Sequence, residues 1–388
     1  MKNRLSATKY IKNNKRTCFV LILALALTFM AMYVIAYIMN ATVESVKPIT
    51  LELPKRIALA NVTYGSLGVK RENFPDQESY ENAGSQARDE FCKRLESDPD
   101  VEKVYFIQTL MAGYVGVVGG VGFNFPLVSP EQVPEVLAHV GAKLTEGRLP
   151  ADDGEVLIDE RILRNGGMKV GDWFQKDSYG EVFKIAGAIR SDGMACVGTP
   201  RGYYNSGWFI TVLCNENSCD FTKLAAKYGV TPSEADGDVI DDIVTNRDLY
   251  EHDVADSVEA TVAVIMLVTM IFLSISMIVA YVSFMRNRVN EYCLYASIGY
   301  RRWEVYGMMM REMFIIFGFG FLIGAVIALP SALLLKEAVL DPAGIVSVAW
   351  YPGMIAKLGA IMLLILGLLQ IPVLVSIWKI KTIDEIED

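Results

Sequence analysis

Four long runs without a charged side chain constrain the fold of this 388-residue chain more than any other feature. They cover 17–43, 260–285, 313–335 and 358–378, and they are 27, 26, 23 and 21 residues long. A helix of about 20 apolar residues crosses the hydrocarbon layer of a bilayer, since it rises about 1.5 Å per residue. Each run is therefore predicted to be a membrane-spanning helix. A composition of 52% hydrophobic and 21% charged residues agrees with this class and excludes an ordinary soluble enzyme.

The distribution of charge predicts the orientation of these helices. Residues 1–17 carry six basic and no acidic side chains, and residues 286–312 carry five basic and three acidic ones. Because positive charge beside a span marks the cytoplasmic side, both termini are expected inside the cell. Residues 40–259 carry a net charge of −15 and are expected outside. An acidic domain argues against nucleic acid as a partner and against attraction to anionic lipid headgroups.

The predicted fold is a membrane α-helical protein with four transmembrane helices and a large mixed α/β extracytoplasmic domain between the first two. The first apolar run is longer than that of a secretory signal and lacks a clear cleavage site, which favours a retained anchor. The four predicted spans are 18–39, 260–285, 313–335 and 358–378. The predicted cytoplasmic segments are the N-terminus 1–17, the loop 286–312 and the tail 379–388. The predicted external segments are the domain with its stalk, 40–259, and the short loop 336–357.

Several elements of the external domain follow from the spacing of apolar residues. Alternation predicts strand-like structure from Ile49 to Tyr64 and a strand over 101–107, and helical spacing predicts a helix over 78–97. The glycine-rich run Gly113–Gly122 is expected to be a flexible apolar loop. Helical spacing without a breaker over 238–259 predicts a stalk continuous with the second span.

Four cysteines fall in the external domain, which permits disulfides. Cys214 and Cys219 enclose four residues and fit a small disulfide loop, but four cysteines allow three pairings, and free or buried thiols fit the sequence equally well. With only His139 and His252 as histidines and no C-x-x-C pair, zinc is not expected.

Other bound ions and cofactors are also not expected. Asp236, Asp238, Asp241 and Asp242 miss the spacing of a calcium loop, so a solvated helix start is the preferred interpretation. The spans contain no ionisable side chain, which argues against an ion-coupled carrier. The sequence has no G-x-x-x-x-G-K-[ST] loop for a nucleotide phosphate, so any ATP must be bound by another protein.

The cytoplasmic loop 286–312 contains the most informative motif. Arg288 and Glu291 form R-x-x-E, and Gly299, Arg301-Arg302 and Glu312 follow at set distances. This spacing resembles the permease domain of MacB/FtsX-type ABC transporters, although Asn290 and Tyr295 depart from the family pattern. The resemblance implies that the loop couples to an ATPase, and positive-inside topology alone is the alternative. The predicted coupling residues are Arg288, Glu291, Gly299, Arg301, Arg302, Glu304 and Glu312.

The external domain carries a second, independent resemblance. The series Gly147–Pro150, Glu155–Glu160, Val170–Asp172 and Lys184–Gly187 is similar to the external core domain of the same family. Together the two resemblances cover most of residues 15–380 and identify a superfamily rather than a substrate.

The resemblance implies a permease subunit in a bacterial plasma membrane that is not itself an enzyme. No cofactor is expected to bind it directly, and ATP and Mg²⁺ are expected on a separate cytoplasmic ABC ATPase. Expected partners also include membrane lipids and a second copy of the chain or another permease. The implied function is mechanical export or extraction of a peptide, antibiotic or lipid-linked substrate. The alternatives are an FtsX-like regulator of a cell-wall hydrolase or peptide sensor, and an anchored binding protein without a motor.

Overall fold

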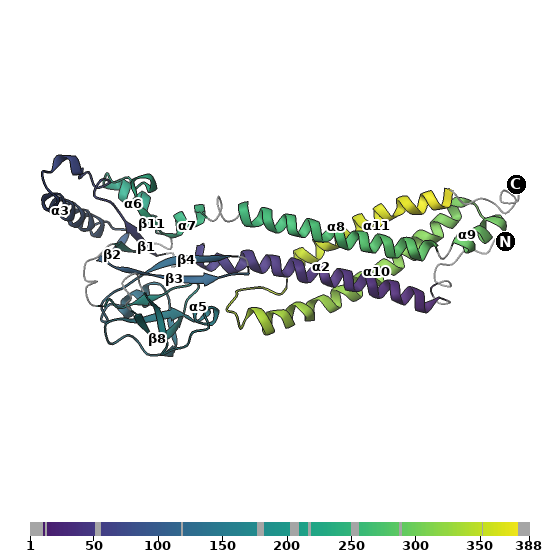
Figure 1. Cartoon of the computed structure of the whole chain (residues 1–388), viewed down its shortest axis with the longest axis horizontal. Coiled ribbons are helices and arrows are strands. Elements are labelled where there is room, and N and C mark those ends of the chain that lie inside the picture. Colours follow the sequence, from purple (N-terminus) through teal and green to yellow (C-terminus); the bar gives the residue numbers. More distant parts are fainter. Residues whose placement is uncertain are drawn as a thin grey trace. The chain divides into compact units, whose positions relative to one another are not determined.

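The chain divides into two compact units (Figure 1). The helical unit comprises 1–40, 260–338 and 348–388, and the α/β unit comprises 41–259 and 339–347. A computed structural model describes residues 11, 14–50, 56–117, 119–176, 182–201, 209–215, 219–249, 256–286, 289–350 and 352–378.

Long apolar helices build the helical unit. Its elements are α2 (Lys15–Thr50), α8 (Asp256–Arg286), α9 (Val289–Ser297), α10 (Arg302–Leu335) and α11 (Pro352–Trp378). The part of α2 after residue 40 and the part of α8 before residue 260 belong to the α/β unit. Within the described residues, two helical stretches, Lys15–Ile49 and Arg302–Leu340, are long and apolar enough to cross a membrane. Two shorter apolar stretches, Ala263–Phe272 and Pro352–Leu368, lie in α8 and α11. That the chain has four membrane-spanning helices therefore remains a prediction.

Small residues bring α10 against α2. A Cβ atom on Gly320 would lie 2.7 Å from Leu25 Cβ, and one on Gly324 would lie 2.9 Å from the carbonyl oxygen of Ala26. One and two turns further on, Ala328 and Ala332 are also buried. This row of small side chains at intervals of four residues lets two helices approach closely, as is typical of helix pairs in membranes.

The α/β unit contains two larger sheets and a hairpin. The first sheet is antiparallel with the order β11-β1-β10-β2, and β3 pairs with β4 as the hairpin. The second sheet has the order β5-β8-β6-β9, with β7 also paired to β8. The strands are β1 (Ile57–Asn61), β2 (Val101–Ile107), β3 (Thr109–Val115), β4 (Gly120–Pro126), β5 (Lys143–Gly147), β6 (Glu155–Asp159), β7 (Trp173–Lys176), β8 (Val182–Arg190), β9 (Val197–Gly198), β10 (Phe209–Cys214) and β11 (Val239–Asp241).

Helices of 6 to 20 residues lie between or after the strands of the α/β unit in the sequence, and several begin with an aspartate that caps free backbone N–H groups. The carboxylate of Asp76 accepts from Ser79 N–H, that of Asp159 from Arg161 N–H, and that of Asp220 from Lys223 N–H. The helices are α3 (Gln77–Glu96), α4 (Val133–His139), α5 (Glu160–Asn165), α6 (Phe221–Lys227) and α7 (Ile243–Leu249).

The four sequence series that resemble an external core domain meet at β8. Gly147 on β5 lies opposite Gly187 on β8, and Glu155 on β6 is in register with Lys184. Gly171 N–H donates to the carbonyl of Ile185. A Cβ on Gly147 would lie 2.4 Å from the carbonyl oxygen of Ala186, so glycine is required there by close approach of the strands. These series therefore specify a sheet rather than a catalytic site.

Three predictions for the external domain were wholly or partly wrong. The predicted stalk over 238–259 begins instead with β11, which pairs with β1, and with α7, while residues 250–255 lie outside the described residues. The strand-like stretch Ile49–Tyr64 is helical up to Thr50, and its strand covers 57–61. The glycine-rich run Gly113–Gly122 lies in the β3–β4 hairpin, because Ala112 and Tyr114 bury one face of the ribbon.

Candidate functional site

The predicted coupling loop contains a sharp turn between α9 and α10. Ile298 N–H donates to the carbonyl of Leu294, and Tyr300 N–H donates to the carbonyl of Tyr295. The second bond, five residues back, closes a Schellman motif in which Gly299 has a φ of +89°. A side chain at this left-handed position is strained, so glycine allows α9 to end and α10 to begin within a few residues.

A glutamate fixes the start of α10 after this turn. Arg301 N–H donates to Glu304 Oε2 at 2.8 Å, and Glu304 N–H donates to the carbonyl of Arg301 at 2.9 Å. The carboxylate thus satisfies an N–H group that the helix itself leaves open and lies where the helix dipole favours negative charge. The side chain of Arg301 stays on the surface.

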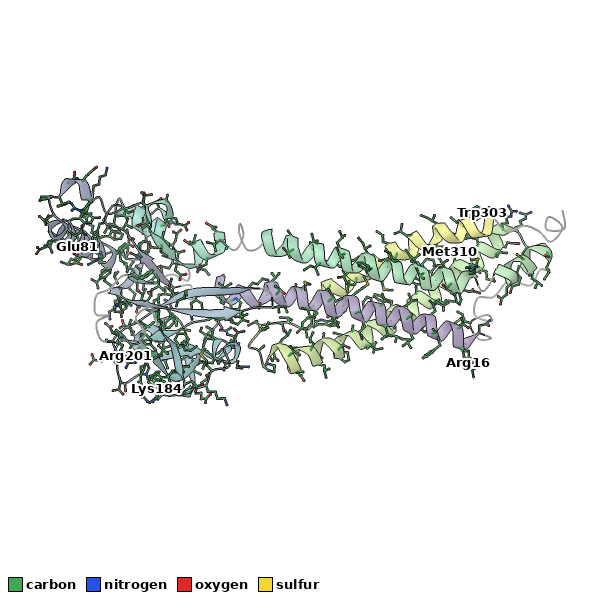
Figure 2. All side chains as sticks on the ribbon, viewed as in Figure 1. Arg16, Glu81, Lys184, Arg201, Trp303 and Met310 are labelled. Atoms are coloured by element: carbon green, nitrogen blue, oxygen red, sulfur yellow. A yellow bond between two sulfur atoms is a disulfide. The ribbon has the colours of Figure 1, made fainter. Side chains whose placement is uncertain are left out.

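Large apolar side chains are exposed at this turn. Leu294, Ile298 and Trp303 are 57%, 63% and 65% exposed, and Trp303, labelled in Figure 2, lies in the first turn of α10. The side chains of Arg301 and Arg302 are exposed beside them. These three apolar residues were not among the predicted site residues, although apolar residues in a charged loop are a signal that could have identified them. We call Leu294, Ile298, Arg301, Arg302 and Trp303 the α9–α10 surface.

The other predicted coupling residues have different positions. Glu291 is half-buried on α9, and Arg288 lies outside the described residues. Glu312 is 2% exposed within α10, so it does not share the exposed α9–α10 surface with the arginines. A role for Glu312 in coupling would have to act through helix packing.

The α/β unit joins Cys214 and Cys219 by a disulfide, in the connection between β10 and α6. The interpretation of Asp236, Asp238, Asp241 and Asp242 as a solvated helix start was right only in part. Asp236 is exposed and Asp242 lies at the start of α7, but Asp238 and Asp242 are buried hydrogen-bond acceptors within the fold. Asp238 accepts from the N–H groups of Thr63 and Ser233 and from the Ser66 hydroxyl. Asp242 accepts from the N–H groups of Phe221 and Thr245, and Asp241 accepts from Asn124 N–H. Among the residues the structure describes, no three His, Cys, Asp or Glu side chains gather as a metal site.

A charged network connects β2 to α4 on the surface of the α/β unit. Lys103 Nζ and the Tyr105 hydroxyl both donate to Glu135, at 2.7 and 3.0 Å. The hydrogen bond from Lys103 lowers the pKa of Glu135, and the same bond raises the pKa of Lys103. His139 lies at the end of α4, with its ring nitrogens 2.9 Å from Glu102 Oε2 and from the Arg56 carbonyl oxygen. This network is a structural link between a helix and a strand.

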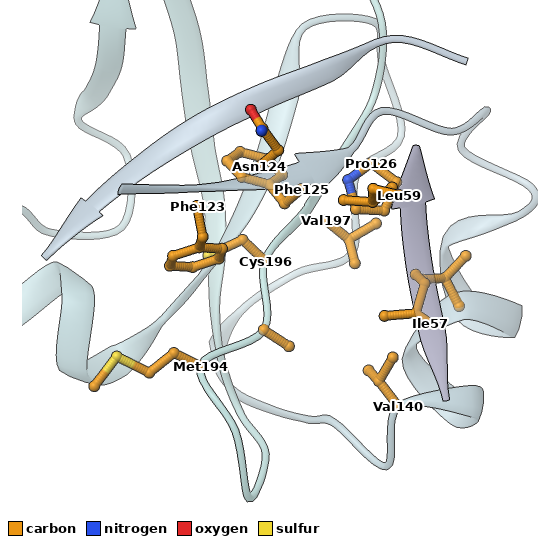
Figure 3. Close-up of a pocket in the computed structure, with 12 residues that line it drawn as sticks. Ile57, Leu59, Phe123, Asn124, Phe125, Pro126, Val140, Met194, Cys196 and Val197 are labelled. Atoms are coloured by element: carbon orange, nitrogen blue, oxygen red, sulfur yellow. The ribbon is translucent and has the colours of Figure 1, made fainter. Parts of the chain in front are cut away.

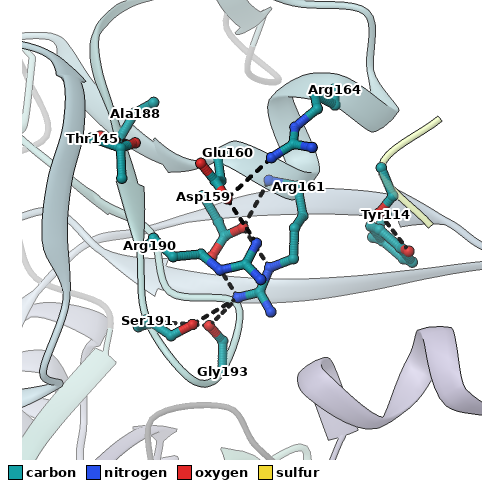
Figure 4. A network of polar contacts seen from close by, with 11 residues as sticks. Tyr114, Thr145, Asp159, Glu160, Arg161, Arg164, Ala188, Arg190, Ser191 and Gly193 are labelled. Carbon is teal, nitrogen blue, oxygen red and sulfur yellow. Dashed lines mark hydrogen bonds and ion pairs between the residues drawn. The ribbon is translucent and has the colours of Figure 1, made fainter. Parts of the chain in front are cut away.

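A buried ion pair stabilises the second sheet (Figure 4). Asp159 accepts from Nε and Nη2 of Arg161 at 2.8 and 2.7 Å, and neither side chain is more than 7% exposed. The same guanidinium donates to the carbonyl oxygens of Ser191 and Gly193. Each charge is therefore paired and hydrogen-bonded, as burial requires.

A small apolar crevice lies between β1, the β3–β4 hairpin, α4 and residues 194–197 (Figure 3). It encloses about 300 Å³ of empty space, part of which is open to solvent. Apart from Asn124 its lining residues are apolar, and the backbone N–H of Asn124 is already bonded to Asp241. Such a lining provides few of the polar groups that orient a substrate.

Comparison with known proteins finds a family that the carboxyl-terminal part of the chain resembles. Residues 263–384, which include the α9–α10 surface, match the FtsX-like permease C-terminal family. This part of the chain is therefore similar to the FtsX-like permeases, and the predicted MacB/FtsX-type resemblance is confirmed. Such permeases are membrane proteins, the transmembrane components of ABC systems, and they work with a cytoplasmic ABC ATPase.

Among solved structures, the chain is similar to the periplasmic region of MacB from Actinobacillus actinomycetemcomitans, with 17% identity. The match covers 53% of this chain and 96% of the MacB region, with a TM-score of 0.25. A likeness of that score carries no argument about function. No curated protein matches the chain.

Proposed function

We propose that this chain is a permease subunit that moves its α/β unit on the outer side of a bacterial plasma membrane when a separate ATPase hydrolyses ATP. In this proposal four spans cross the membrane and both termini are cytoplasmic. The moving unit exports or extracts a peptide, an antibiotic or a lipid-linked molecule. ATP and Mg²⁺ are bound by the ATPase.

The observation that carries the proposal is the α9–α10 surface, because it lies inside the region that matches FtsX-like permeases. Exposed apolar side chains such as Trp303 are unfavourable in water and mark surfaces that a partner covers. The guanidinium groups of Arg301 and Arg302 add charge-assisted hydrogen bonds to carboxylates. The complementary ATPase surface is thus an apolar groove with an acidic rim.

Reversal of both arginine charges tests this docking surface. The variant Arg301→Glu with Arg302→Glu introduces the same charge change as the control variant Lys93→Glu with Arg94→Glu, whose residues are exposed on α3. Each tagged chain is purified from its native membrane in mild detergent, and the eluate is analysed by mass spectrometry and an ATPase assay. The wild type and the control should recover an ATPase with Walker motifs, and the α9–α10 variant should not. Normal recovery by that variant would contradict the proposal.

The same purification separates the alternative functions. A co-purifying cell-wall hydrolase would favour a regulator that transmits movement, whereas ATP-dependent loss of a labelled peptide from cells would favour export. Recovery of the wild-type chain without any ATPase, under conditions that preserve known membrane complexes, would indicate an anchored receptor.

A further inference from the structure

The segment 339–347 connects α10 to α11, yet it belongs to the α/β unit. It forms a compact turn in which Gly344 N–H donates to the Asp341 carbonyl at 3.0 Å and Ile345 N–H donates to the Leu340 carbonyl at 2.9 Å. Gly344 has a φ of +68° and is buried. Leu340, Gly344 and Ser347 are thus the buried side of a hydrogen-bonded turn, and Val339 and Pro342 are exposed on it.

The side chain of Tyr114 on β3 forms hydrogen bonds with the backbone of this turn. The Tyr114 hydroxyl donates to the Gly344 carbonyl at 3.0 Å and accepts from Val346 N–H at 3.3 Å. The side chain is 1% exposed, and Figure 4 shows its hydroxyl directed at the yellow-green segment. One buried hydroxyl thus satisfies a donor and an acceptor of the 339–347 segment.

Asn165, at the end of α5, joins the same turn to β3. Its Nδ2 donates to the carbonyl oxygens of Val115 and Ala343 at 2.7 and 2.9 Å, and its Oδ1 accepts from Val115 N–H at 2.7 Å. A side-chain amide suits this position, because the surrounding backbone groups require two N–H donors and one oxygen acceptor. A carboxylate there would place negative oxygen against two carbonyl oxygens.

The site that holds the turn, its seat, leaves no room for a side chain at Gly344. A Cβ on Gly344 would lie 2.3 Å from the Arg161 carbonyl oxygen and 2.9 Å from Asn165 N, both of which are backbone atoms. The side chain of Arg161 is fixed in turn by its buried ion pair with Asp159. Val346 packs against the core cluster that also contains Ile49 from the end of α2.

We propose that the 339–347 segment is a permanent attachment of the α10–α11 connection to β3 and α5, held by Asn165 and Gly344 as positioning residues. Displacement of α10 and α11 is then passed to the β3–β4 hairpin through backbone hydrogen bonds. The attachment itself stands on the contacts above. Its role in ATP-driven movement rests on the proposed function.

Hydrogen exchange of the full-length chain in detergent, read by mass spectrometry, tests the attachment without ATP. Asn165→Asp should accelerate exchange in peptides covering 339–347 about tenfold, since it removes the donor to the Ala343 carbonyl and a hydrogen bond contributes about that factor. Gly344→Ala should also accelerate exchange there, because its Cβ would collide with the Arg161 carbonyl oxygen. The controls are Asn82→Asp, exposed on α3, and Gly353→Ala, at a helical glycine with open space around it. Both should exchange like the wild type. Equal exchange in Asn165→Asp and the wild type would overturn the attachment.

The purified complex with its ATPase tests the transmission. ATP and Mg²⁺ should change exchange in peptides of the β3–β4 hairpin of the wild type, and Asn165→Asp should lose this change while ATP hydrolysis continues. A variant that keeps the change would overturn transmission through this seat. A wild-type complex without any ATP-dependent change would overturn the proposed movement, while the ATP-free experiment still decides the attachment.

Discussion

Replacement of Arg161 by alanine should unfold the α/β unit at a much lower urea concentration, because it leaves a buried carboxylate without its cation. Asp159 is 0% exposed and receives two hydrogen bonds from the Arg161 guanidinium. Truncation also removes the donor to the carbonyl oxygens of Ser191 and Gly193. An unpaired buried charge is among the most destabilising changes that a single substitution makes.

The expected shift is large enough to measure directly. Loss of one partner of a buried ion pair costs about 3–5 kcal/mol. With a dependence on urea of about 2 kcal/mol per molar, the midpoint falls by about 1.5–2.5 M. Arg164→Ala is the control on the same helix, because its ion pair with Glu160 is at the surface and its own side chain is 50% exposed. Surface pairs contribute about 0–1 kcal/mol, so the control shifts the midpoint by less than about 0.5 M.

Cys196 provides the readout. Its side chain lies in the same core cluster as Ile158 and Ile162, and burial raises the pKa of its thiol, so that it reacts only when this core opens. Modification of Cys196 by a maleimide is followed by mass spectrometry across a urea series. Equal midpoints for Arg161→Ala and Arg164→Ala would refute the reasoning. Asp159→Asn combined with Arg161→Met should recover part of the loss, because no charge is then left buried.

Three further predictions concern other parts of the chain. Gly324→Leu should lower the thermal unfolding midpoint of the detergent-purified chain, because overpacking lowers the free energy of unfolding by about 1–3 kcal/mol. The control Gly318→Leu should not lower the midpoint, since a Cβ at Gly318 meets open space. Equal midpoints would argue against close packing of α2 and α10. Trp303→Ala should weaken ATPase association about tenfold or more in a binding titration, and unchanged affinity would remove Trp303 from the docking surface. The ionised Glu135 carboxylate stabilises the fold fully above its ordinary pKa of 4.5, and this contribution is lost as the pH falls through the lowered pKa of the folded state. Glu135→Gln should therefore reduce the loss of stability on acidification. An unchanged acid unfolding curve would count against the ion pair with Lys103.

Local elements of the α/β unit could be predicted well from the sequence. The helix predicted over 78–97 is α3 at 77–96, and the strand predicted over 101–107 is β2. Both elements have local signals, since Asp76 caps the helix and the apolar residues then repeat with the period of each structure. Predictions that depend on such signals need no knowledge of distant contacts.

The glycine-rich hairpin shows where local signals fail. Glycines on the exposed face of the ribbon, such as Gly113 and Gly122, hide the alternation that Leu110, Ala112 and Tyr114 make on the buried face. The ordered pairing of β3 with β4 depends on packing against the core, which a window of sequence does not contain.

The candidate site was only partly predictable. The turn at Gly299 and the exposed arginines follow from the motif in the loop, since a glycine after a helix and charges beside a span have local causes. The burial of Glu312 and the hydrogen bonds of Asp238 depend on residues far away in the chain, such as Thr63 for Asp238. The same holds for the seating of 339–347 against Tyr114 and Asn165.

The division of the α/β unit into 41–259 and 339–347 has a consequence for biosynthesis. The ribosome must add 88 residues after residue 259 before the seat formed by Tyr114, Asn165 and Arg161 can be filled. At about 5–20 residues per second this takes roughly 4–18 s. During that interval the polar groups of the seat have water as their partner, and the core cluster lacks Val346. The unit therefore reaches its final stability only when α10 has been synthesised, so a chain that stops after α8 leaves this part of the protein unfinished.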